Sequence, residues 1–178
     1  MKFSVGDWVV HPEQGTGQIT DKEQLDLVKG FKSYYKLEIL DTNLVVHVPI
    51  REVEALGIRP IMSRDRLARV LAILGSKPRQ LSTAFKTRQA RLQKKLKTGQ
   101  PLRIAEVIRD LTWRKRNANL SAGDVTLLEL GQDLLTTEIA AVTNTEPTKA
   151  RQAILDALDE TTASKSAQPA PQESIKGT

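Results

Sequence analysis

The chain has 178 residues, 39% of them hydrophobic and 27% charged, which is enough for one or two packed domains. It contains no cysteine, which excludes disulfides, thiolate catalysis and cysteine-based zinc sites. No apolar run reaches the roughly eighteen residues of a membrane span, and the N-terminal residues lack the apolar core of a signal peptide, so we expect a cytoplasmic protein.

The net charge of +6 is unevenly distributed along the chain. Residues 76–116 contain thirteen Lys and Arg against two acids, so this segment carries +11 and the remainder carries −5. Such segregation predicts a surface that binds a polyanion, most simply a nucleic acid. The alternative is a basic helix face that is merely solvated.

Residues 1–56 have the pattern of a small β-domain. Short apolar runs bounded by Gly, Pro and Asx residues predict strands at 8–10, 18–20, 34–40 and 44–48. The last two are joined at Asp41–Asn43, which favours a hairpin turn. This pattern is typical of a closed antiparallel SH3-like or Tudor-like barrel, with Phe3, Trp8 and Tyr35 in its core.

A helical pattern follows a boundary at 57–60. Ser63 and Ser121 are expected N-caps, Pro101 favours a first turn, and Gly75 is expected in a left-handed position at a helix end. The predicted helices are 63–74, 81–97, 101–116, 121–142 and 145–158.

We therefore expect an α+β protein: a β-barrel domain (1–58), a basic five-helix domain (61–160) and a tail (161–178). The tail is rich in Ser, Ala, Gln and Pro and has too few large apolar residues to fold, so it is predicted to be disordered.

Catalytic and metal-binding motifs are missing from the sequence. The two histidines, His11 and His47, lie on different predicted strands without cysteine or a close carboxylate pair, so no metal site is expected. Phosphate-binding loops and nucleophile motifs are absent as well. We predict a protein that is not an enzyme, has no cofactor and has no small-molecule substrate.

The helix expected over 81–97 raises a specific question about Phe85. Four apolar residues share one arc of this helix: Leu81, Phe85, Leu92 and Leu96. Periodicity alone therefore favours core packing of Phe85. Its place in the first turn, beside Arg79, Lys86 and Arg88, favours instead a surface ring that enters a minor-groove base step while the cations hold phosphates.

Seven short motifs, in their order and spacing, resemble the CarD/CdnL family of bacterial RNA polymerase-binding transcription factors over about residues 1–160. They are Val5–Pro12, Gly15–Gly17, Tyr35–Ile39, Val46–Pro49, Gly99–Pro101, Ile104–Leu111 and Leu120–Gly123. The N-terminal part alone also resembles a module of the transcription-repair coupling factor, whose helicase motifs this sequence lacks.

The resemblance implies that a Tudor-like domain docks on the β subunit of RNA polymerase, and that the helical domain contacts promoter DNA at the upstream edge of the bubble. In the family a tryptophan wedges into the minor groove there. Counting back fourteen residues from Gly99 places Phe85 at that position, with Arg88 at a basic position beside it. The DNA contacts expected are Phe85, Lys86, Arg88, Arg91 and Arg79. The polymerase contacts expected are His47, Val45, Tyr34 and Lys36.

From the resemblance we expect a nucleoid-associated initiation factor that stabilises the promoter open complex. An architectural DNA-binding protein that acts without polymerase is the main alternative, although such a protein would not need the β-domain. An RNA- or ribosome-associated protein also fits a small barrel with a basic appendage, but the barrel has few exposed aromatic residues for base stacking.

Overall fold

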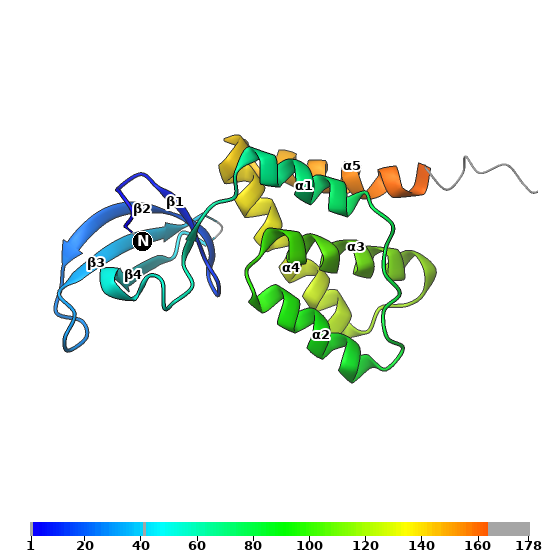
Figure 1. Cartoon of the computed structure of the whole chain (residues 1–178), viewed down its shortest axis with the longest axis horizontal. Helices are drawn as coiled ribbons and strands as arrows, with labels where there is room; N and C mark the ends of the chain where they lie inside the picture. Colours follow the sequence, from blue (N-terminus) through cyan, green and yellow to red (C-terminus); the bar gives the residue numbers. More distant parts are fainter. Residues whose placement is uncertain (1, 41, 164–178) are drawn as a thin grey trace, which may run out of the picture.

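A computed structural model describes residues 2–40 and 42–163 of the chain. They form two units that lie side by side (Figure 1): the sheet unit, residues 2–61, and the helical unit, residues 62–163. Each unit buries its own cluster of apolar side chains. Among the described residues, no helix is both long and apolar enough to cross a membrane.

The sheet unit is one antiparallel sheet in the order β4-β3-β2-β1-β5. Its strands are β1 (Trp8–His11), β2 (Gly15–Gln24), β3 (Ser33–Ile39), β4 (Val45–Pro49) and β5 (Arg59–Pro60), with a 3-10 turn at Ile50–Glu52. The prediction of a closed barrel is wrong, because β4 and β5 are opposite edges and do not pair with each other in the described part of the chain. β4 therefore presents an edge that no other strand covers among residues 2–40 and 42–163.

The core of the sheet unit lies on one face of β1–β4. Phe3 and Tyr35 are buried there as predicted, and the Tyr35 hydroxyl accepts a hydrogen bond from Phe3 N and donates one to Phe3 O, both at 3.0 Å. Trp8 is only half-buried and lies outside this cluster, so its predicted core position is wrong.

Five helices form the other unit: α1 (Arg64–Leu74), α2 (Phe85–Lys97), α3 (Pro101–Asn117), α4 (Ala122–Thr143) and α5 (Pro147–Ala163). The predicted caps are confirmed, since Ser63 accepts from Arg66 N and Ser121 forms a capping box with Asp124. Gly75 is right-handed rather than left-handed, with φ −78°.

Two helix boundaries differ from the prediction. α2 begins at Phe85 instead of residue 81, because the carbonyls of Ser82 and Thr83 accept hydrogen bonds from the Arg88 side chain. α5 continues to Ala163, so residues 161–163 are helical although they were assigned to the disordered tail. The rest of that tail, 164–178, lies outside the described residues.

α2 and α4 run side by side in the same direction. Gln89 near the start of α2 donates to Ser121 at the start of α4, and Leu96 near the end of α2 packs against Gly131 in the middle of α4. A Cβ on Gly131 would lie 3.2 Å from an Ile108 side-chain carbon of α3, so the glycine allows these helices to approach closely.

Candidate nucleic-acid interface

The structure places Phe85 on the surface. It is the first residue of α2 and its side chain remains 54% exposed, whereas Leu92 and Leu96 on the same arc are buried. Arg88 and Gln89 bond to Asp124 and Ser121 at the start of α4, so the first turn of α2 precedes the point where α2 meets α4. The spacing of apolar residues favoured a core position for Phe85, because spacing alone carries no information about where a neighbouring helix begins or ends.

Arg88 is buried, with 3% of its surface exposed, and each of its three side-chain nitrogens donates a hydrogen bond. Nη2 lies 2.7 Å from a carboxylate oxygen of Asp124, and Nη1 donates to Ser82 O at 2.8 Å and Thr83 O at 3.1 Å. The guanidinium is therefore occupied inside the protein and does not face solvent, where the expected phosphate contact would form. We infer instead that Arg88 positions the residues that precede Phe85.

The Asp124 carboxylate joins the starts of two helices. Burial by itself would raise its pKa, but hydrogen bonds from Arg88 and Ser121 outweigh burial and hold the pKa below its ordinary value. The same carboxylate accepts from Ser121 N in the capping box of α4. Phe85 is therefore carried on a helix end whose position is set by a buried ion pair.

The segment 75–84, which connects α1 to α2, is also held by hydrogen bonds near its beginning. Arg79 N donates to Asp110 at 2.9 Å, and Arg109 donates to the Ser76 hydroxyl at 2.8 Å while pairing with Asp110. Because both ends are bonded to buried side chains, this segment holds the start of α2 in place. The Arg79 side chain itself is exposed.

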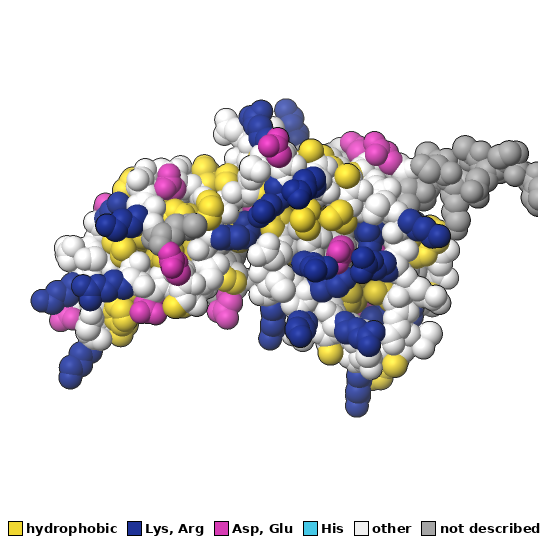
Figure 2. Space-filling view, in the orientation of Figure 1, with side chains coloured by type: hydrophobic (Ala, Val, Ile, Leu, Met, Phe, Trp, Pro, Cys, Tyr) yellow, Lys and Arg dark blue, Asp and Glu magenta, His cyan; other side chains and the backbone are white. Residues whose placement is uncertain are grey.

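Ion pairs inside the protein reduce the charge available on the basic segment. Five of its thirteen bases pair with acids: Arg88, Lys95, Arg103, Arg109 and Arg116. Eight make no ion pair with the described residues, and all of these except Arg114 are exposed: Lys77, Arg79, Lys86, Arg91, Lys94, Lys97, Arg114 and Lys115. Figure 2 shows Lys and Arg side chains gathered over the helical unit.

The outer face of the sheet carries three of the residues predicted to contact polymerase. Val45 is 42% exposed on the edge strand β4, and its neighbour His47 is half-buried, with Nε2 2.9 Å from Glu23. Lys36 lies opposite His47 in the register of β3 and β4. These residues share the face of the sheet away from its core.

Tyr34 does not fit the predicted contact, because it is only 1% exposed. Its hydroxyl accepts from Val28 N at 3.1 Å and donates to Phe31 O at 3.4 Å, so the β2–β3 loop covers it. The same loop exposes Leu27 and Val28, which the sequence analysis overlooked. Two adjacent aliphatic residues between the strands predicted at 18–20 and 34–40 are the signal that could have identified them.

No three His, Cys, Asp or Glu side chains among the described residues are close enough to hold a metal ion.

Comparisons with known proteins cover most of the chain. The family model described as the CarD-like/TRCF RID domain matches residues 3–62, and the one described as the CarD C-terminal domain matches residues 69–155. A protein of Bacillus subtilis (strain 168) named "Putative transcription factor YdeB" is 26% identical over 140 residues, which is 79% of this chain and 92% of the relative. The two family models fall on the sheet unit and the helical unit respectively.

Removing the Arg88 side-chain charge should destabilise the protein strongly. Arg88→Met leaves the Asp124 carboxylate buried without its partner, and we expect the free energy of unfolding to fall by about 3–5 kcal/mol in urea titrations. The matched control is Arg151→Met, which breaks the exposed ion pair to Asp133 and should cost about 1 kcal/mol or less. Equal losses in the two variants would contradict the buried role of Arg88.

The same ion pair should give a pH dependence of stability. Because folding lowers the pKa of Asp124, its stabilising contribution is fully present above its unfolded pKa, about 3.9, and is lost as the pH falls through the lower folded pKa. In Asp124→Asn this part of the acid dependence should disappear, as measured by urea unfolding between neutral and acidic pH.

Proposed function

Because the chain belongs to the CarD-like family of transcription factors, we propose that it bridges RNA polymerase and promoter DNA and stabilises the open complex. In this proposal the sheet unit binds the polymerase β subunit, and the helical unit contacts the minor groove at the upstream edge of the bubble. The observation that carries it is Phe85: a large apolar ring exposed at a rigidly held helix start.

The DNA contact combines an apolar wedge with cations that hold phosphates. Apolar rings inserted at a minor-groove step fill the gap between partly unstacked base pairs. Lys86 is next to Phe85 and Arg91 lies less than two turns along α2, and both are exposed without an ion pair to the described residues. Ala84 provides no side-chain cap, so the first-turn N–H groups of α2 are additional donors for a phosphate.

Specificity in this contact comes from the shape of the DNA and not from base edges. Phosphate contacts fix register without reading sequence, and a wedge favours steps that are already unstacked. The upstream edge of a bubble offers such a step, since the cost of unstacking, a few kcal/mol in intact duplex, is already met there. Arg88 contributes by holding the backbone of Ser82 and Thr83, which directly precede the helix that carries Phe85.

The polymerase contact uses the free edge of the sheet. An uncovered edge strand can pair with an extended partner strand through backbone hydrogen bonds, while neighbouring side chains select the partner. β4 is such an edge, with Val45 exposed and with Lys36 and His47 on the same face. Leu27 and Val28 add exposed apolar surface on the loop that covers Tyr34.

Substitutions of Phe85 should change open-complex lifetime without changing stability. We expect Phe85→Ala to shorten the lifetime while leaving the melting temperature nearly unchanged, because surface changes alter stability by only about 0.5 kcal/mol. Phe85→Trp should lengthen the lifetime, since the larger ring covers more of the unstacked step. The readout is the decay of open complexes on one promoter after addition of a competitor.

The control for Phe85 is Leu155→Ala, which trims an exposed apolar side chain on α5 and should leave the lifetime unchanged. A large drop in melting temperature for Phe85→Ala, together with no gain in lifetime for Phe85→Trp, would refute the wedge.

A charge at the β4 edge should weaken polymerase binding. We expect Val45→Asp to reduce capture of core polymerase by the full chain, because it places a carboxylate in an apolar contact. Val125→Asp is the matched control, since Val125 on α4 is similarly exposed (38% against 42%) but lies in the other unit. Equal capture by both variants would mean that polymerase binds elsewhere, or that the protein acts on DNA alone.

A further inference from the structure

We propose that Arg59 and Glu138 form a fixed joint between the two units, which sets the spacing between the polymerase-binding surface and Phe85. This inference rests on the proposed function for its consequence, but the joint itself is a property of the isolated protein.

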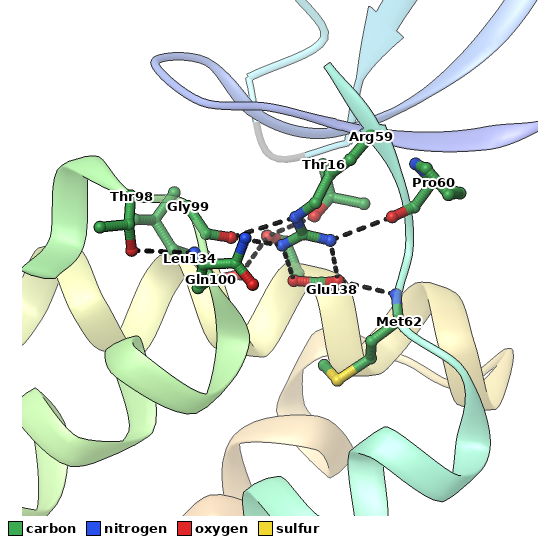
Figure 3. A network of polar contacts seen from close by, with 10 residues as sticks. Thr16, Arg59, Pro60, Met62, Thr98, Gly99, Gln100, Leu134 and Glu138 are labelled. Carbon is green, nitrogen blue, oxygen red and sulfur yellow. Dashed lines mark hydrogen bonds and ion pairs between the residues drawn. The ribbon is translucent and has the colours of Figure 1, made fainter. Parts of the chain in front are cut away.

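The centre of the joint is the carboxylate of Glu138, in the second half of α4 (Figure 3). Only 2% of its side chain is exposed. Oε1 accepts from Arg59 Nη1 at 2.7 Å and from Met62 N at 2.8 Å, and Oε2 accepts from Arg59 Nη2 at 2.9 Å. One buried acid therefore binds both a side chain and the backbone of the chain that connects the units.

The Arg59 guanidinium also reaches the end of α2. Nε and Nη2 donate to Gly99 O at 3.1 and 2.6 Å, and Gly99 adopts a left-handed conformation (φ +61°) between α2 and α3. α2 has 13 residues, or about 20 Å of rigid helix, with the joint at its C-terminal end and Phe85 at its N-terminal end. The position of Phe85 relative to the sheet is thus set through α2 itself.

A second attachment prevents rotation about the first. Leu134 and Thr137 lie on the same face of α4 as Glu138. The Thr137 hydroxyl is 3.4 Å from that of Thr16 on β2, and a Leu134 methyl group would lie 3.8 Å from a Cβ on Gly15. Two separated contacts between α4 and the sheet unit restrain both the direction and the twist of one unit against the other.

The physical reason for a single orientation is the set of interactions that other orientations would lose. Swinging the units apart would separate the Arg59 guanidinium from both oxygens of Glu138 and from Gly99 O at once. A closed joint also preorganises binding: once the sheet unit is bound to polymerase, Phe85 is presented to one place at high effective concentration. Loosening the joint should lower this concentration without changing either contact surface.

The experiment measures both orientation and function on the full chain. The sequence has no cysteine, so a pair of spin labels can be introduced at Lys29→Cys, in the β2–β3 loop, and Gln93→Cys, on the exposed face of α2. We expect a narrow distance distribution in this background and a broad one after Glu138→Gln. Open-complex lifetime should shorten about tenfold or more as effective concentration is lost, while binding to duplex DNA alone and to polymerase alone stays unchanged.

The matched control is Asp133→Asn, which removes another ion pair of α4, to Arg151 of α5 within the helical unit. It should leave both the distribution and the lifetime unchanged. Arg59→Lys provides a second variant should Glu138→Gln fail to fold. Lysine keeps the charge but cannot reach Glu138 and Gly99 O together, so an intermediate width and an intermediate lifetime are expected.

Two results would overturn the proposal: a narrow distribution in Glu138→Gln, or a broad distribution with an unchanged lifetime. Failure of the proposed function gives a different result, because then the original chain itself has no effect on lifetime. The distance distributions would still decide whether the joint exists.

Discussion

The arrangement of the two units depends on the ion pair between Arg59 and the buried carboxylate of Glu138. Glu138 lies on α4. The same helix carries another buried carboxylate, that of Asp124, fourteen residues earlier and about 21 Å away along the helix. Asp124 holds the start of α2 through Arg88, and Glu138 holds the sheet unit through Arg59. One helix therefore connects Phe85, the proposed wedge, with the proposed polymerase-binding surface. Breaking either ion pair would leave an unpaired charge in the interior, so both are expected to persist.

Charge has two separate uses in this protein. Some arginines stabilise the fold. Arg59, Arg88 and Arg109 each bind a buried carboxylate and neighbouring backbone or hydroxyl groups. Others, such as Lys86 and Arg91, remain exposed and are available to phosphates. A wedge is effective only if its backbone does not yield when the ring enters the DNA. In the proposed DNA contact, the buried arginines supply that stiffness and the exposed bases supply the attraction to phosphates.

Local features were predictable from the sequence because local chemistry determines them. Ser63 and Ser121 cap their helices as predicted. The hydroxyl of each accepts a hydrogen bond from the backbone N–H three residues later, so the contact depends only on local sequence. The motifs also identified the family. Tyr34 is buried by a loop only a few residues earlier in the chain, and the strand pattern did not indicate how that loop folds. The burial of Arg88 was not predictable, because its partner Asp124 becomes a neighbour only through tertiary packing. For the same reason the sequence did not reveal the Arg59–Glu138 pair, whose members are 79 residues apart.

We propose that one rigid molecule contacts polymerase and the upstream edge of the bubble at the same time. The most direct test is photo-crosslinking from position 85, with a photoreactive phenylalanine analogue in place of Phe85 in a complete polymerase–promoter complex. We expect crosslinks confined to one or two nucleotides at the upstream edge of the bubble, and only when polymerase is bound. Crosslinks spread along duplex DNA, or equally strong without polymerase, would contradict it.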